Sequence, residues 1–264
     1  MPAVVADLVA EGDDLDDIVK GLTPEQWSLP TPAPEWTITH QVGHLAATFR
    51  LAAMAASRPE QFTTFISTLS PNFKANVDAA MADFITERPA ALLTRWRAER
   101  RNAEQALAAL PPQQMVPWLV RPIPAAVLAA AGMMESFAHG QDILDALGLQ
   151  RRHTDRLRHL VAFAVMTWDF GYQARDLTPP QVEFRFEIKA PSGEIWAFGP
   201  QDTDQVIAGD AVDFCLLVTR RRHRDDLKVH ATGELADEWL NIAQAYRGPA
   251  GDGRRPGQFM PSTA

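Results

Sequence analysis

Residues 124–148, PAAVLAAAGMMESFAHGQDILDALG, carry the signals of one long helix and decide the fold class. Pro124 suits the first helical turn, where the N–H that proline lacks would have no partner in any case. Gly148 ends the helix, because glycine adopts the left-handed conformation that closes a helical C-terminus without strain. The stretch therefore predicts a long helix between these two residues.

Three more segments predict long helices before it. Apolar residues recur with a period near 3.6 in residues 3–22, with acidic residues between them. Thr37 or Thr39 can cap a helix that runs to about Ser57. Leucine, alanine and arginine dominate residues 90–110, which favours a helix there. Four long helices predict an up-and-down four-helix bundle.

Further helices and a change of pattern follow from the rest of the chain. Residues 62–84 are interpreted as a helical insertion, and residues 153–173 as a fifth helix. After residue 180 the pattern changes, because residues 182–188 (VEFRFEI) alternate apolar and charged side chains. This alternation is typical of a strand with one face in water.

The C-terminal third predicts a small α+β unit. Its remaining elements are a turn at 191–193, strands at 194–198 and 227–232, and helices at 210–218 and 235–246. We therefore predict an α+β protein with a helical domain at 1–175 and an α+β domain at 176–248. The glycine, proline and arginine of residues 249–264 predict a loose tail.

Composition excludes several classes of protein. The formal net charge of −8 and the pI near 5.4 argue against a nucleic-acid partner, because a polyanion would approach against the net field. No stretch reaches the roughly 18 to 20 apolar residues that a membrane span needs. The acidic N-terminus is unlike a signal peptide. We expect a cytoplasmic protein that uses neither membrane nor nucleic acid.

The chain has a single cysteine, Cys215, within the apolar run at 214–218. One cysteine excludes an internal disulfide and every multi-cysteine metal motif. An apolar setting raises the pKa of a thiol, so Cys215 is interpreted as an inert core residue. Any sulfur chemistry would need a thiol that a cofactor brings.

A possible metal site lies on two of the predicted helices. Glu135 and His139 are four residues apart, so they project from one helix face about 6 Å apart along the axis. His44 lies within the apolar run Val42–Ala46 of the second helix. If these two helices are neighbours in the bundle, the three side chains converge in its core.

Two imidazoles and a carboxylate are a common open zinc set, and they also match the facial triad of non-haem iron. A solvated Glu–His pair on a helix surface is the alternative. His40, one turn before His44, could compete as a ligand, but its place after the capping threonines favours exposure. Asp142 is either an acceptor behind a ligand imidazole or a surface acid.

Several motifs resemble those of the DinB-like superfamily, in particular the mycothiol-dependent maleylpyruvate isomerases. They are residues 22–27 (LTPEQW), 30–32 (PTP), 36–38 (WTI) with His44 and Leu45, and 134–143 (MESFAHGQDI). Residues 207–214 (IAGDAVDF) and 231–233 (ATG) resemble the C-terminal domain of the same family. Residues 213–223 and 239–248 resemble an actinobacterial subfamily of these proteins.

The resemblance implies site residues. The zinc ligands of the family fall on His44, Glu135 and His139. Its arginine for a substrate carboxylate or thiol cofactor falls on Arg221 or Arg222, which could otherwise be a solvated helix terminus. A bidentate guanidinium would suit an anionic substrate.

The resemblance also implies a function and one departure from it. It implies a DinB-like fold, a divalent metal, zinc, and mycothiol, in a transferase or isomerase that acts on a small electrophilic substrate. Met133 and Met134 stand where a basic residue is expected, which argues against the substrate of the isomerase itself. Two alternatives remain: a thiol-independent metal-dependent isomerase, cyclase or hydrolase, and a non-catalytic metal-stabilised protein that binds a small molecule.

Overall fold

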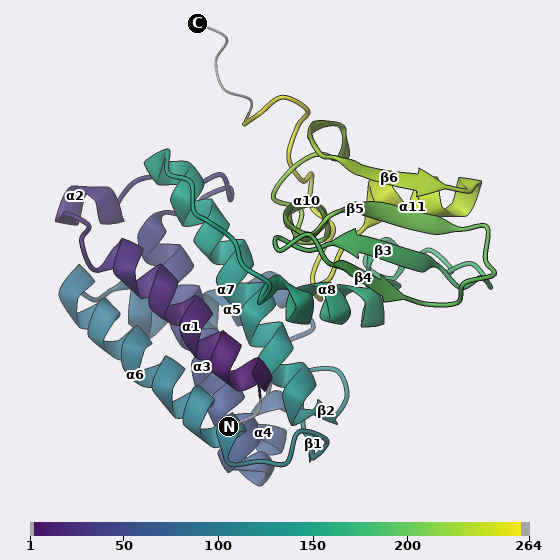
Figure 1. The fold of residues 1–264 in the computed structure, drawn as a ribbon. Helices are drawn as coiled ribbons and strands as arrows, with labels where there is room; N and C mark the ends of the chain where they lie inside the picture. The colour runs from purple at the N-terminus through teal and green to yellow at the C-terminus, as the bar shows by residue number, and fades with distance from the viewer. Residues whose placement is uncertain (1–2, 260–264) are drawn as a thin grey trace, which may run out of the picture. The chain divides into compact units, whose positions relative to one another are not determined.

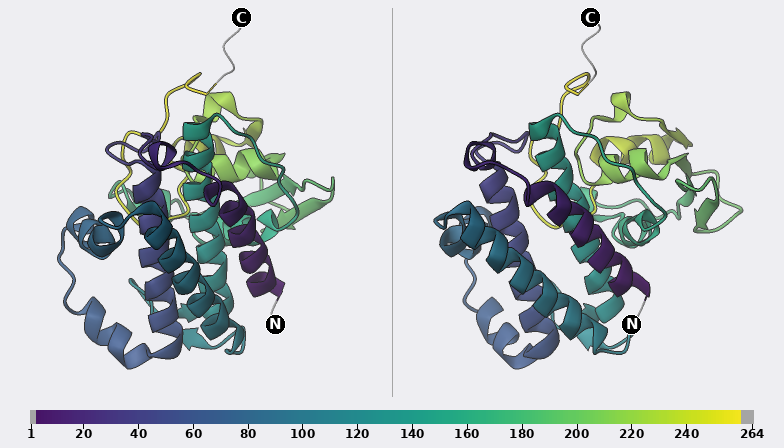
Figure 2. Two further views of the ribbon diagram at one scale, coloured as in Figure 1. Left: turned by 90° about the vertical axis from the view of Figure 1, so that its left-hand side faces the viewer. Right: turned by 60° about the vertical axis from the view of Figure 1, so that its left-hand side comes forward.

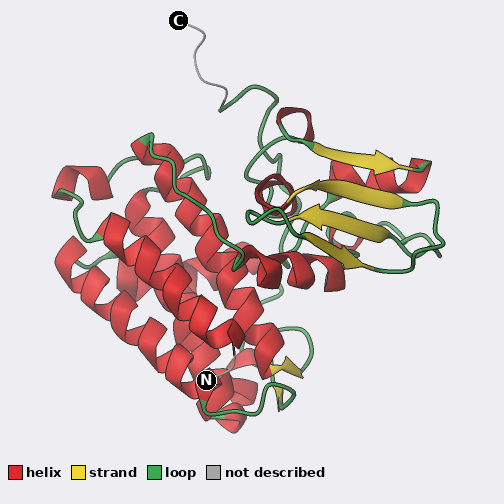
Figure 3. Cartoon of the chain, in the orientation of Figure 1, coloured by secondary structure: helices red, strands yellow, loops and turns green. Residues whose placement is uncertain are grey.

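The computed structural model describes residues 3–259, which form two compact units that divide after Arg151 (Figure 1). The first unit is almost entirely helical, and the second combines helices with a sheet (Figure 3). The predicted α+β class is therefore confirmed. None of the helices in this part of the chain is long and apolar enough to cross a membrane.

Four long helices lie side by side in the first unit (Figure 2). They are α1 (Ala3–Val19), α3 (Ile38–Ser57), α6 (Pro89–Ala108) and α7 (Ala125–Leu147). Helix α7 begins after Pro124 and ends at Gly148, whose φ is 64°. The predicted four-helix bundle is confirmed, and so is the end of α7 at Gly148. Pro124 directly precedes the first turn, as the last residue of a short strand, instead of lying within the turn.

Glycines on α7 set how closely α1 approaches it. A Cβ at Gly132 would lie 3.3 Å from Leu8 Cδ1, and one at Gly140 would lie 3.6 Å from Leu15 Cδ1. Because both residue numbers rise together in these pairs, α1 and α7 run in the same direction. Leu8 and Leu15 are buried in this contact.

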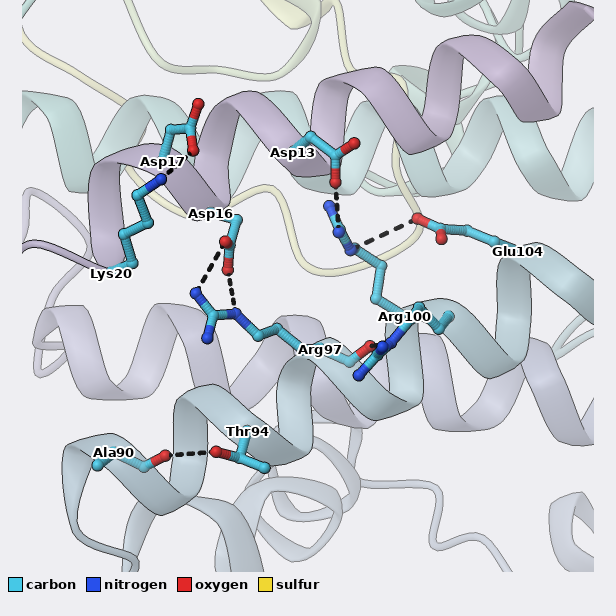
Figure 4. A network of polar contacts seen from close by, with 10 residues as sticks. Asp13, Asp16, Asp17, Lys20, Ala90, Thr94, Arg97, Arg100 and Glu104 are labelled. Carbon is cyan, nitrogen blue, oxygen red and sulfur yellow. Dashed lines mark hydrogen bonds and ion pairs between the residues drawn. The ribbon is translucent and has the colours of Figure 1, made fainter.

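Ion pairs join α1 to α6 (Figure 4). Arg97 donates two hydrogen bonds to the carboxylate of Asp16, at 2.6 and 2.8 Å. Arg100 donates to Asp13 at 2.6 Å and lies 3.5 Å from Glu104 on its own helix. Since Asp13 pairs with the later arginine and Asp16 with the earlier one, α1 and α6 are antiparallel.

The long connection between α3 and α6 holds the predicted helical insertion. It contains two helices, α4 (Pro59–Ile66) and α5 (Phe73–Ile85). The end of α5 returns to the first half of α3, where a Cβ at Gly43 would lie 2.9 Å from Ile85 Cγ2. The connection is therefore a crossover, and α3 and α6 run in the same direction, unlike consecutive helices of the predicted up-and-down arrangement.

Short elements complete the first unit. Helix α2 (Pro24–Trp27) is capped by Thr23, and β1 (Met115–Val116) pairs with β2 (Ile123–Pro124) just before α7. Neither strand was predicted, because two residues are too few to show alternation.

The second unit contains a four-stranded sheet in the order β4-β3-β5-β6. Its elements are α8 (Leu157–Met166), α9 (Phe170–Gln173), β3 (Arg185–Lys189), β4 (Ile195–Phe198), β5 (Val206–Asp210), α10 (Ala211–Val218), the 3₁₀ turn η1 (Arg224–Asp226), β6 (Val229–Thr232) and α11 (Glu234–Ile242). Strands β3 and β5 are parallel, and the other pairs are antiparallel.

Two predictions for this unit were wrong. Residues 153–173 form two helices, because the chain leaves the helical conformation at Thr167, whose φ and ψ are −110° and 24°. Residues 249–259 are not a loose tail. Arg220 donates to the Gly251 carbonyl at 3.2 Å, and the Gly257 N–H donates to Asp226 at 2.8 Å. Residues 1–2 and 260–264 of the predicted segments lie outside the described residues.

The division after Arg151 also differs from the predicted boundary at residue 175. Helix α8 packs against α10 and β4, so its apolar face belongs to the core of the second unit. Trp239 of α11 joins the same core and donates from Nε1 to the Trp168 carbonyl at 2.8 Å.

Candidate metal centre

Three side chains from two helices of the bundle converge on one point. Glu135 Oε2 lies 3.1 Å from His139 Nε2, one turn along α7, and 3.4 Å from His44 Nε2 on α3. The ligand atoms of all three residues lie within 4.8 Å of one another. In residues 3–259, no other group of three or more His, Cys, Asp or Glu side chains comes this close.

The convergence follows from helix packing. Helices α3 and α7 pack against each other, so the α7 face that carries Glu135 and His139 meets the first half of α3. The three side chains are only 12 to 22 % exposed. The structure thus brings together the three residues that spacing and resemblance singled out.

The site strongly perturbs the carboxylate. Burial by itself raises the pKa of Glu135, because it penalises the ionised form. Hydrogen bonds and charge from His139 and His44 outweigh burial and hold the pKa well below its ordinary range. Glu135 is therefore an anion at neutral pH, with its oxygen directed between two imidazoles.

The other nitrogen of His139 is held by a residue that the sequence analysis missed. His139 Nδ1 lies 2.5 Å from Gln41 Oε1, and Gln41 Nε2 donates to Asp142 Oδ2 at 3.4 Å. Gln41 and Asp142 are both fully buried. Asp142 is therefore no surface acid, and Gln41 stands between its carboxylate and the imidazole. Only its position in the sequence could have identified Gln41, because it lies three residues before His44 and thus on the same helix face.

An aromatic ring packs beside the imidazoles. The Trp36 ring is stacked on His139 with centroids 5.8 Å apart, and its centroid is 5.3 Å from that of His44. Both the N–H and the hydroxyl of Thr31 donate to the Trp36 carbonyl, which fixes the loop that carries the ring. Thr48 adds a hydroxyl 3.4 Å from His44 Nε2.

His40 has a local role at the start of α3. Its Nδ1 accepts a hydrogen bond from the Thr37 N–H at 3.2 Å and lies 2.8 Å from the Thr37 hydroxyl. This arrangement caps the helix, and His40 is not part of the converging group.

The match to a family model covers the region that holds this geometry. Residues 8–144 match the model described as mycothiol maleylpyruvate isomerase N-terminal domain. The chain belongs to this family. The stretch from 8 to 144 contains all three converging residues, together with Gln41 and Asp142. Residues 180–232, in the second unit, match a model described as wyosine base formation.

Relatives and solved structures extend the likeness over both units. Two uncharacterized proteins of Mycobacterium tuberculosis, from strains CDC 1551 / Oshkosh and ATCC 25618 / H37Rv, are each 44% identical over 250 residues. The alignment covers 95% of this chain and 97% of theirs. The crystal structure of the mycothiol-dependent maleylpyruvate isomerase, and that of a mutant of it, match with a TM-score of 0.54 at 16% identity. Each match covers 86% of this chain and 91% of the other, and it supports the fold alone.

Arg221 and Arg222 follow α10 in the second unit. Resemblance to the mycothiol maleylpyruvate isomerase family singled out these two arginines. Arg221 Nη1 donates to the Thr219 carbonyl, and Arg222 Nη1 donates to the Arg221 carbonyl, both at 2.7 Å. The guanidinium of Arg222 also lies 3.9 Å from the centroid of the Phe259 ring. Their role in binding an anion remains a prediction.

Proposed function

We propose that the chain is a metal-dependent enzyme that uses a thiol cofactor, mycothiol, as an S-transferase or isomerase on a small electrophilic substrate. The metal is zinc, held by His44, Glu135 and His139. The observation that carries the proposal is the convergence of two imidazole nitrogens on one ionised carboxylate oxygen. Mycothiol is proposed as the thiol because the description of the matching family model names it.

The donor set fits zinc on its own geometry. Two ligand atoms at about 2.05 Å from a tetrahedral zinc ion lie about 3.3 Å apart. The separations of 3.1 and 3.4 Å from Glu135 Oε2 to the two histidines are close to this value. Three protein ligands leave a fourth position open, as in catalytic rather than structural zinc sites.

When bound, the metal lowers the pKa of a coordinated thiol, so that thiolate predominates at neutral pH. Around it, the Trp36 ring excludes water from one side of the imidazoles. The Thr48 hydroxyl is a hydrogen-bonding group beside His44. By resemblance to the family, we further propose that Arg221 or Arg222 binds an anionic group of the substrate or cofactor.

The reaction follows from a thiolate and an activated double bond. Addition forms a carbon–sulfur bond, and a proton goes to the neighbouring carbon, which gives the transfer product. Addition also turns the carbon–carbon double bond into a single bond. If rotation about this carbon–carbon bond occurs and the thiolate leaves before that proton arrives, the double bond re-forms in the trans geometry. The same site therefore supports both reactions, and the substrate decides between them.

The test is turnover by zinc-loaded protein with mycothiol and a panel of electrophiles that includes maleylpyruvate. Two readouts are needed, because transfer consumes thiol and isomerisation returns it: loss of free thiol, and conversion of cis to trans substrate. Either activity should exceed that of the His44→Ala variant. Turnover that needs no thiol would overturn the thiol-dependent proposal, and absence of any turnover would favour a binding protein.

A further inference from the structure

The amide of Gln41 is completely buried and makes hydrogen bonds in three directions. Its Oε1 lies 2.5 Å from His139 Nδ1. Its Nε2 donates to Thr31 Oγ1 at 2.8 Å and to Asp142 Oδ2 at 3.4 Å. Thr31 and Asp142 come from the loop before α3 and from α7, so the amide is held from two sides.

These partners allow only one orientation of the amide. The Thr31 hydroxyl donates its hydrogen to the Trp36 carbonyl at 2.9 Å. Its oxygen therefore faces Gln41 with a lone pair and acts as an acceptor. A carboxylate oxygen of Asp142 is also an acceptor. Both neighbours therefore require the NH₂ end of Gln41, and the carbonyl end must face His139.

A carbonyl that faces His139 Nδ1 requires a hydrogen on that nitrogen. A neutral imidazole with its hydrogen on Nδ1 has its lone pair on Nε2. In this structure Nε2 is the atom that faces Glu135 Oε2 at 3.1 Å. With the amide reversed, an N–H would face Nδ1 and place the hydrogen on Nε2, which would block the ligand position.

We infer that Gln41 is a positioning residue that sets the tautomer of His139, and that Thr31 and Asp142 set the orientation of Gln41. The inference rests on the proposed metal site for its purpose, since the selected tautomer is the one that can bind a metal through Nε2. Outer partners of this kind typically contribute 10- to 100-fold to metal affinity. The same chain of bonds fixes the loop that carries Trp36.

The test compares the wild type with Gln41→Met, which keeps an unbranched side chain but has no strong acceptor. The control is Gln141→Met on α7, a buried glutamine whose amide donates to Asp145 at 2.8 Å. The first readout is the ¹⁵N shifts of the His139 ring in metal-free protein. The second is zinc affinity by competition with a chromogenic chelator.

In the metal-free wild type and in Gln141→Met we expect a hydrogen on His139 Nδ1 toward Gln41, beside the Nε2 hydrogen that faces Glu135. In Gln41→Met we expect loss of the Nδ1 hydrogen, which leaves Nε2–H alone. Zinc affinity should fall 10- to 100-fold in Gln41→Met and change less than threefold in the control. If Gln41→Met does not fold, Thr31→Val, which removes the nearer of the two acceptors that orient the amide, should show a smaller shift in the same direction.

An unchanged tautomer in folded Gln41→Met, or an equal effect in the control, would overturn the inference. Failure of the proposed function has a different signature. In that case the wild type binds no zinc, while the tautomer measurement still decides the role of Gln41.

Discussion

His40 and Thr37 close the first turn of α3: the Thr37 N–H donates to His40 Nδ1 at 3.2 Å. This bond commits the Nδ1 lone pair of His40 to the helix terminus. It separates two histidines that stand one turn apart on the same helix, because His44 instead directs Nε2 toward Glu135.

The two histidines should therefore respond differently to substitution. His40→Ala should bind zinc as tightly as the wild type but lose roughly 1 kcal/mol of stability, the usual contribution of a helix cap. His44→Ala should lose zinc binding. Zinc titration and urea unfolding of the metal-free proteins measure both effects. A loss of zinc binding in His40→Ala would make His40 a ligand and contradict the assignment.

The ion cluster between α1 and α6 predicts a pH dependence of stability (Figure 4). Burial raises the pKa of Glu104 above 4.5, although Arg100 opposes the shift. Between pH 4.5 and the raised pKa, the folded chain binds more protons at Glu104 than the unfolded chain does. Stability from this group is thus present at low pH and is lost as the pH rises.

Glu104→Gln removes this ionisation. Its stability relative to the wild type should therefore increase from pH 4 to pH 7, as followed by urea midpoints at each pH. A relative stability that falls over the same range would show that the ion pair with Arg100 outweighs burial.

A glycine in the second unit is predicted to tolerate no side chain. A Cβ at Gly171 in α9 would lie 2.1 Å from the Ile242 carbonyl oxygen at the end of α11, a backbone atom that cannot move away cheaply. Gly171→Ala should cost roughly 1 to 3 kcal/mol or more. At Gly21 nothing lies within 4 Å of a built Cβ, so Gly21→Ala is the control. Equal urea midpoints for the two variants would contradict the packing.

The arginines after α10 predict a kinetic effect without an effect on the metal. Loss of a charge-assisted hydrogen bond of about 1.5 to 3 kcal/mol should raise KM about 10- to 150-fold in Arg221→Gln or Arg222→Gln, whichever residue binds the anion. Zinc content should not change. Arg224→Gln, which breaks a pair with Asp237, is the control. If KM is the same in all three variants, the anion is bound elsewhere.

The long helices could be predicted because their signals are local. Pro124 and Gly148 mark the two ends of α7 in the sequence. The proximity of Glu135 to His139 follows from helix geometry, because the two residues are one turn apart. Strand β5 was missed as a strand because Val206–Asp210 includes a glycine and ends on an acid, with no clean alternation. The helix break at Thr167 is a local change of backbone angles within an apolar stretch, and the hydrophobic pattern does not show it.

Gln41 shows where sequence reasoning about the site ends. A glutamine in an amphipathic helix has no distinctive spacing, and its importance depends on Asp142, 101 residues further along the chain. Likewise, the proximity of His44 to the α7 pair required α3 and α7 to be neighbours. Helix patterns alone left this condition open, whereas family resemblance supplied it.

The zinc content of the purified chain tests the central claim most directly. Wild-type protein loaded with zinc and passed through a desalting column should retain one equivalent by elemental analysis. His44→Ala, Glu135→Ala and His139→Ala should each retain far less while remaining folded. A wild type that retains no zinc, or variants that retain as much as the wild type, would contradict a metal centre at these three residues.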